Sequence, residues 1–343
     1  MECKGCTTLP QIHFTDVMVC LTVPTHHHVA PIGQFLDTLG TGYSFEEDTF
    51  LFHATSFADI VRELEQMGLS GIEKQDIRLL PYPAGEPLSF RHLKHRKNLL
   101  YWTDLALAAS FLDILGNARI EVRFQPIVEA RTGKIFGYEG LSRGVLPDGS
   151  RMMPDELFSH ARKTDTMFFL DRVCRESVIA AAAARHITEK VFINFIPTSI
   201  YDPDKCLKTT DAALRRHGLH PEQIVFEVVE TEYIEDFKHL NHILDYYRAK
   251  GYATALDDMG SGYATTDSLL NLKPNYLKVD MDIVRDVDRD LHKQQILQSF
   301  LSMGRKHGIR TLAEGVETEA EFSHVRAAGV DFVQGYYFGK PEP

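Results

Sequence analysis

From residue 121 to the C-terminus, short apolar runs of strand length alternate with segments of helical pattern, and this alternation constrains the fold most. We expect eight strands, at residues 121–128, 135–142, 191–195, 223–229, 252–257, 276–280, 309–313 and 330–334. Helical patterns separate most of them, including 155–186 and 236–250. This order predicts an α/β fold, a TIM-like (βα)8 barrel. The turn at 130–134 is too short for a crossover helix, so the first strand is expected to run antiparallel.

The fifth expected strand ends in two carboxylates, Asp257 and Asp258, and glycines follow at 260 and 262. Taken alone, such a pair is most often a solvated turn or a helix N-cap. Neighbouring side chains on a strand point to opposite faces, so these two can share a site only if the strand breaks between them. The glycines permit such a break. Adjacent carboxylates repel each other, and a divalent cation bound by both would remove the repulsion.

Polar side chains also stand at the ends of the other expected strands, and in a barrel those ends gather at one rim. These residues are Glu139, Arg143, Asn194, Glu227, Glu230, Asp257, Asp258, Lys278, Asp280, Glu314, Glu317 and Gln334. The set contains no histidine or cysteine, and oxygen ligands suit hard cations such as Mg²⁺ or Mn²⁺. Two such ions can hold the attacking and leaving oxygens of a phosphate displacement. The pattern therefore indicates a two-metal site for phosphate chemistry.

The same residues fall within eight motifs. They are FQPIV (124–128), YEGLSR (138–143), FINFIP (192–197), FEVVE (226–230), LDDMGSGYATTDSL (256–269), LKVD (277–280), AEGVE (313–317) and QGYYFGKP (334–341). Over roughly residues 102–343 the chain resembles the EAL-domain family of cyclic di-GMP phosphodiesterases, with the motifs in family order. It departs from the family at Gly140, where the signature has alanine, and at Val229 and Met259, where threonine and phenylalanine are common.

The resemblance implies a binuclear metal site. One ion would be bound by Glu139, Asn194, Glu227 and Asp257, and Asp257 would bridge to a second ion held with Asp258. Both cations would be Mg²⁺ or Mn²⁺. Glu314 would act mainly through metal-bound water, and Lys278 would help to activate the attacking water.

The resemblance also implies how the substrate is held. Gln125 and Arg143 would position the guanine and phosphate portions, while Glu317 and Gln334 would shape the site. Glu230 would steady the loop 257–266. The implied reaction is hydrolysis of one phosphodiester bond of cyclic di-GMP, which gives linear pGpG. Two alternatives remain: a catalytically silent cyclic di-GMP receptor, and a protein-interaction scaffold.

The sequence pattern of residues 1–88 predicts a separate small α/β module, which we expect to be regulatory. Its strands are expected at 17–23, 49–53 and 77–80, its helices at 32–39 and 57–67, and a breaker at 81–87. Residues 89–116 predict one long helical connector, whose basic cluster at 91–97 we interpret as a solvated face. The barrel would occupy 117–343.

Cysteines near the N-terminus raise a second metal question. Cys3 and Cys6, with Cys20, His13 and the histidines at 26–28 nearby, could hold zinc, but a second CxxC or a spaced histidine pair is missing. Incidental thiols are the preferred interpretation.

Composition limits the remaining classes of function. The net charge of −11 argues against a nucleic-acid polymer as partner. Apolar runs stay well below the roughly 18 residues of a membrane span, which excludes a spanning helix. An odd number of cysteines, 5 in all, favours reduced thiols and a cytoplasmic location. Family analogy favours a homodimer.

Overall fold

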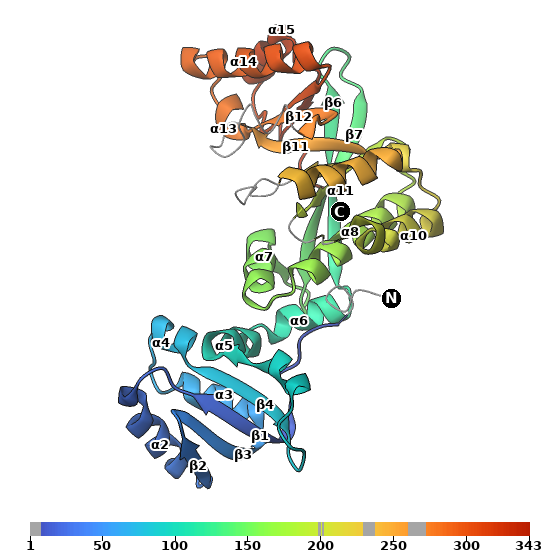
Figure 1. The fold of residues 1–343 in the computed structure, drawn as a ribbon. Helices are drawn as coiled ribbons and strands as arrows, with labels where there is room; N and C mark the ends of the chain where they lie inside the picture. The colour runs from blue at the N-terminus through green and yellow to red at the C-terminus, as the bar shows by residue number, and fades with distance from the viewer. Residues whose placement is uncertain (1–7, 198–199, 201, 229–236, 260–271) are drawn as a thin grey trace. The chain divides into compact units, whose positions relative to one another are not determined.

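The computed structural model describes residues 8–197, 200, 202–228, 237–259 and 272–343, which divide into two compact units (Figure 1). The larger unit comprises residues 117–154 and 168–343. The smaller unit comprises residues 8–116 and, from further along the chain, residues 155–167. Each unit has a hydrophobic core of its own.

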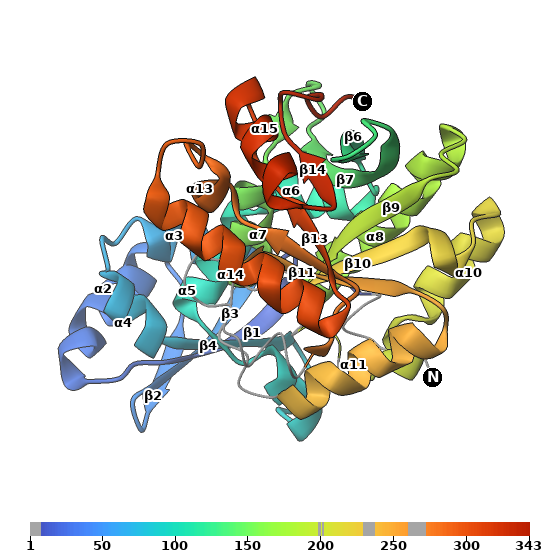
Figure 2. The same ribbon diagram turned by 90° about the horizontal axis from the view of Figure 1, so that it is seen from above.

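Among the described residues of the larger unit, eight strands close into a barrel, as the sequence predicts (Figure 2). Around the barrel they are β6 (Ile120–Glu129), β14 (Phe332–Gln334), β13 (Arg310–Ala313), β12 (Tyr276–Val279), β11 (Ala253–Met259), β10 (Ile224–Val228), β9 (Lys190–Phe195) and β7 (Ile135–Val145). β6 pairs antiparallel with both β7 and β14, whereas the other neighbours pair parallel. The expected antiparallel first strand is therefore confirmed. The short strand β8 (Arg151–Met152) extends the edge beside β7.

Helices lie outside the barrel strands (Figure 2). They are α8 (Met167–Ala184), α9 (Pro203–Cys206), α10 (Lys208–His217), α11 (Phe237–Ala249), α13 (Met281–Val284), α14 (Leu291–His307) and α15 (Glu319–Ala328), with the 3-10 turn η4 (Pro221–Gln223). The helical segment expected at 155–186 is broken, because α7 (Pro154–Lys163) ends before Asp165, which has a positive φ of 54°. Apolar side chains between strands and helices form the main core.

The smaller unit is built on an antiparallel sheet with the order β2-β3-β1-β4-β5. Its strands are β1 (Thr15–Thr22), β2 (Tyr43–Glu46), β3 (Thr49–Ser56), β4 (Arg78–Pro83) and β5 (Lys97–Asn98). Its helices are η1 (His26–His28), α2 (Val29–Thr38), α3 (Phe57–Glu65), α4 (Gly71–Asp76), η2 (Phe90–His95), α5 (Leu99–Leu107), α6 (Ala109–Gly116) and most of α7. The three expected strands and two expected helices are present. β2, β5 and α4 were not foreseen, and β4 continues through Pro83 into the expected breaker.

The expected single connector helix at 89–116 is wrong. The segment contains η2, β5 and two helices, α5 and α6, whose axes differ by 66°. β5 pairs with β4, and Leu99, Trp102 and Leu105 of α5 are buried in the core of the smaller unit. Tertiary packing therefore makes this segment part of the module. Across the described residues, no single helix is long and apolar enough to cross a membrane, and α5 and α6 meet that test only as a bent pair.

Candidate active site

The candidate site is a layer of polar side chains inside the barrel. It lies next to a layer of apolar side chains, one step along the strands. The apolar layer of the interior consists of Ile127, Phe192, Val225, Ala255, Tyr276, Leu312 and Phe332. Side chains on a strand alternate between its faces, so positions two residues away point inward again. Those positions hold Gln125, Asn194, Glu227, Asp257, Lys278, Glu314 and Gln334. β7 adds Glu139, which lies opposite Gln125. The strand pattern thus brings most of the predicted site residues together at one end of the barrel.

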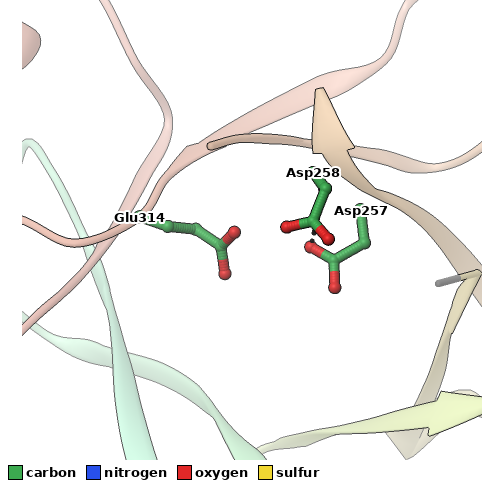
Figure 3. Close-up of side chains that lie close together, drawn as sticks. All are labelled: Asp257, Asp258 and Glu314. Atoms are coloured by element: carbon green, nitrogen blue, oxygen red, sulfur yellow. Dashed lines mark hydrogen bonds between the residues drawn. The ribbon is translucent and has the colours of Figure 1, made fainter. Parts of the chain in front are cut away.

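Asp258 joins this layer because the strand is irregular. The pairing of β11 with β12 shifts between Leu256 and Met259, so β11 carries an extra residue there. Asp258 has a φ of 53°, in the left-handed region, and its N–H donates to Asp257 Oδ1 at 3.0 Å. Oxygens of Asp257, Asp258 and Glu314 all lie within 4.8 Å of one another (Figure 3). The strand break expected between the two aspartates is therefore a bulge at Asp258 itself.

Lys278 lies at the centre of the carboxylates and is 1% exposed. Its Nζ is 2.8 Å from Glu227 Oε1, 2.9 Å from Asp257 Oδ1 and 2.8 Å from Glu314 Oε1. Burial acts to lower the pKa of Lys278, but these three carboxylates outweigh it and raise the pKa well above its usual value. Lys278 is therefore a protonated donor.

A chain of amides holds Glu139 on the other side of the site. Asn194 Nδ2 donates to Glu139 Oε1 at 3.1 Å, and Gln334 Nε2 donates to Glu139 Oε2 at 2.6 Å. Gln334 Nε2 also lies 3.1 Å from Gln125 Oε1, and Gln125 Nε2 donates to Gly339 O at 3.2 Å. Burial acts to raise the pKa of Glu139, but Lys278 and these amide donors outweigh it and lower the pKa. Glu139 is therefore held as a carboxylate.

Three further carboxyl groups of the site have raised pKa values, because they are buried close to other carboxyl groups. Burial raises the pKa of Glu227 and of Glu314 well above the usual range, even with Lys278 beside them. Burial and, next, the charge of Asp257 raise the pKa of Asp258 to about 6. A single lysine thus faces more negative charge than it can neutralise.

This donor set fits hard divalent cations. Every candidate ligand atom is an oxygen, as Mg²⁺ and Mn²⁺ prefer. Glu227 is fully buried, and no group in the described part of the structure donates a hydrogen bond to its Oε2. Buried acceptors without a donor are costly, so a cation would relieve both this orphaned atom and the crowding of Asp257, Asp258 and Glu314.

A cavity of about 280 Å³ opens onto these residues. Its lining includes Gln125, Glu139, Leu141, Asp258, Asp280, Met281, Glu314, Glu317, Gln334 and Tyr336. Glu317 lies in the lining but forms a paired ion contact with Arg285, at 2.5 and 2.7 Å. Arg143 is not among the lining residues, and its Nη1 donates to Ser142 O at 2.9 Å.

Two residues of the site were given no role from the sequence. Asp280 stood among the strand-end residues, and the structure places it in the cavity lining, where its charge further raises the pKa of Asp258. Arg285 lies 32 residues before its partner Glu317 and carries no local sequence signal.

Some predicted residues lie outside the described part of the structure. They are Glu230, most of the loop 257–266, and the cysteines Cys3 and Cys6. Cys20 is a free thiol in β1. Among the described residues, the acidic, histidine and cysteine side chains close enough to share one ion are Asp257, Asp258 and Glu314.

The sequence is similar to those of curated proteins over the barrel region. The probable cyclic di-GMP phosphodiesterase PdeG of Escherichia coli K12 is 32% identical over 237 residues, which cover 66% of this chain and 45% of that protein. The chain thus spans less than half the length of the first curated relatives it matches.

Solved structures match the barrel. The c-di-GMP-bound crystal structure of a standalone versatile EAL protein from Vibrio cholerae O395 is 40% identical, with a TM-score of 0.60, covering 65% of this chain and 92% of that one. The PaMucR phosphodiesterase in complex with c-di-GMP is 25% identical, with a TM-score of 0.62, covering 69% and 97%. Residues 108–341 match the EAL domain family itself. The chain therefore belongs to the EAL domain family.

Proposed function

We propose that the chain is a metal-dependent phosphodiesterase that hydrolyses cyclic di-GMP to linear pGpG. The observation that carries the proposal is the cluster of Asp257, Asp258 and Glu314, whose oxygens lie within 4.8 Å beside a cavity. The names of PdeG and PaMucR support cyclic di-GMP as the substrate.

Two divalent cations, Mg²⁺ or Mn²⁺, would be held by the oxygen ligands of the polar layer. One would be held by Glu139, Asn194, Glu227 and Asp257, and the second by Asp257 and Asp258. When bound, such ions supply positive charge to the phosphodiester and make water a better nucleophile near neutral pH. The orphaned Glu227 Oε2 supports this assignment.

The side chains of the protein do the rest of the chemistry. Water adds to the phosphorus and one P–O ester bond breaks, which leaves a phosphate monoester and a free hydroxyl. Lys278 Nζ lies beside Asp257 and Glu314, at 2.9 and 2.8 Å, and from there it would orient the attacking water and stabilise developing negative charge. Glu314 lines the cavity, with Oε1 2.8 Å from Lys278 Nζ, and would accept the proton that the attacking water gives up.

The cavity lining would orient the substrate. Gln125 and Gln334 would shape the floor through their shared hydrogen bond, and Glu317 would be fixed in place by Arg285. Arg143 follows Leu141 on the same face of β7 and would reach a phosphate or guanine beyond the cavity edge. Glu230 would anchor the loop 257–266.

The test is a product assay with purified protein. With Mn²⁺ or Mg²⁺, cyclic di-GMP should give pGpG by chromatography, EDTA should stop the reaction, and Asp257→Ala should abolish it. Asp282→Ala is the matched control, because Asp282 is an exposed carboxylate outside the cavity lining. Cyclic di-GMP binding without pGpG release would show a receptor instead, and absence of both would show a scaffold.

We further propose that the N-terminal part modulates this activity. The proposed division is a module of residues 8–116 together with residues 155–167, and a barrel of residues 117–154 and 168–343. The chain leaves the barrel unit after Pro154, runs through the smaller unit as α7, and returns at Phe168. Within the smaller unit, His160 of α7 stacks on Phe111 at 5.5 Å, and Lys97 Nζ lies 2.6 Å from Asp165 Oδ2. In the chain, α7 lies between β8 and α8. Because β8 pairs with β7, the module is tied to the strand that carries Glu139.

The proposal includes a homodimer acting in the cytoplasm, as the family resemblance suggests. Sedimentation velocity tests the first point and cell fractionation tests the second. If the protein sediments as a monomer at all concentrations, dimerisation has no part in its regulation.

A further inference from the structure

A buried ion pair on α8 lies next to the barrel wall. Arg175 donates to Asp171 Oδ2 through Nε at 2.9 Å and Nη2 at 2.8 Å, and through Nη1 to Thr210 Oγ1. Asp171, Arg175 and Thr210 are 4%, 2% and 0% exposed. Burial acts to lower the pKa of Arg175, but Asp171 outweighs it and raises the pKa. The Arg175 guanidinium is therefore buried against the Asp171 carboxyl group.

Stability alone does not explain such a pair. Removing two charges from water is expensive, and apolar side chains of similar volume often stabilise a fold as well or better. An apolar pair could not accept a hydrogen bond, however. Asp171 Oδ1 accepts one from the backbone N–H of Ile196 at 3.1 Å. Ile196 is the residue directly after β9, which ends at Phe195.

The end of β9 is the part that carries Asn194. The paired residues of β7 and β9 end at Gly140 and Ile193, whereas β10 pairs with β9 as far as Phe195. On the other side, Asn194 pairs with Glu227 of β10. The hydrogen bond from Ile196 to Asp171 ties this strand end to α8. From there Asn194 Nδ2 reaches Glu139 Oε1 at 3.1 Å.

We infer that Asp171, held in place by Arg175 and Thr210, is a positioning residue that fixes the end of β9 so that Asn194 faces the metal site. The inference rests on the proposed function, in which Asn194 is a metal ligand. Asp171 is not one of the proposed ligands, and it would act through its hydrogen bond with the Ile196 amide.

The test compares two double variants that both lack the ion pair. Asp171→Asn with Arg175→Met keeps an oxygen acceptor for the Ile196 N–H, whereas Asp171→Ala with Arg175→Met removes it. Both variants replace the cation with an apolar side chain, so neither leaves a buried charge unpaired. Binding of Mn²⁺ is measured by calorimetry, and folding by circular dichroism.

We expect the Asn–Met variant to bind Mn²⁺ within about threefold of wild type. The Ala–Met variant should bind about tenfold more weakly, as is typical when a group that orients a ligand is lost. Asn194→Ala added to the Ala–Met variant should cause no further loss, because both changes remove the same ligand. Glu176→Ala is the matched control: it breaks the ion pair of Arg172 and Glu176 on the same helix, at 3.7 Å, and should leave affinity unchanged.

Equal Mn²⁺ affinity of the two double variants overturns the inference. A further loss of Mn²⁺ affinity when Asn194→Ala is added to the Ala–Met variant also overturns it. If the Ala–Met variant does not fold while the Asn–Met variant does, hydrogen exchange at Ile196 decides: unprotected exchange in the wild-type protein overturns the inference, and protection supports it. Wild-type protein that binds no Mn²⁺ overturns the proposed function and this inference together. Wild-type binding with indistinguishable double variants overturns the inference alone.

Discussion

Gly140 stands where the family signature has alanine, and the structure gives a physical reason that can be tested. A Cβ at Gly140 would lie 2.4 Å from Val178 Cγ1 and 3.0 Å from Cγ2, far inside van der Waals contact. Val178 is 1% exposed and β-branched on a helix, so it has no free rotamer to move into. Overpacking of this kind costs about 1–3 kcal/mol. Alanine recovers about 0.5–1 kcal/mol of the conformational cost of glycine in a strand.

Gly140→Ala should therefore destabilise the barrel by about 1–2 kcal/mol, or about 2–8 °C in Tm. Val178→Ala should cost about 2–3 kcal/mol, because it removes two buried methyl groups and leaves a small cavity. In the double variant, the new methyl group at 140 occupies the space that Val178 vacates. The double variant should then be at least about 1 kcal/mol more stable than the sum of the single changes. Urea unfolding measures these values, and Mn²⁺ binding reports whether Glu139, the adjacent residue, has moved.

A neighbouring glycine supplies the control. A Cβ at Gly137 would lie 2.6 Å from the backbone oxygen of Lys190, which no change at Val178 can relieve. Gly137→Ala and Val178→Ala should therefore be additive. If the unfolding free-energy changes of Gly140→Ala and Val178→Ala add within about 0.5 kcal/mol, the methyl group at residue 140 does not occupy the space that Val178 vacates, and the reasoning is refuted.

Three further predictions follow from the site and the units. Asp257→Ala should abolish pGpG release at saturating Mn²⁺, and near-normal turnover would contradict the two-metal assignment. Asp258 has a raised pKa of about 6, so below that pH its proton must leave before a cation binds. The affinity for Mn²⁺ measured by calorimetry should fall as pH drops through about 6, and a flat profile would refute this. A fragment beginning at Leu99 exposes core residues such as Trp102 and should aggregate more than one beginning at Asn117. The Asn117 fragment should keep pGpG as product with an altered rate, and unchanged rate and sedimentation would remove the regulatory role.

Local sequence pattern determined the barrel and most of its site. The sequence alone predicts strand length, the two-residue alternation and the short turn at 130–134, because each depends only on neighbouring residues. The same alternation places Asn194 two residues beyond Phe192, and Glu227 two beyond Val225, in one polar layer. Asp257 and Glu314 follow by the same rule.

Tertiary structure decided what depends on partners far apart in the chain. The sequence indicated a break near Asp257 and Asp258, but only pairing with β12 shows a bulge with Asp258 in the left-handed region. The sequence pattern of residues 89–116 predicts one helix. An apolar pattern alone does not reveal that Trp102 packs into the core of the smaller unit. Val178 lies 38 residues beyond Gly140 in the printed sequence, and their contact arises only when α8 packs on β7. Local propensity sets each element, whereas close packing between distant elements sets which side chains share one space.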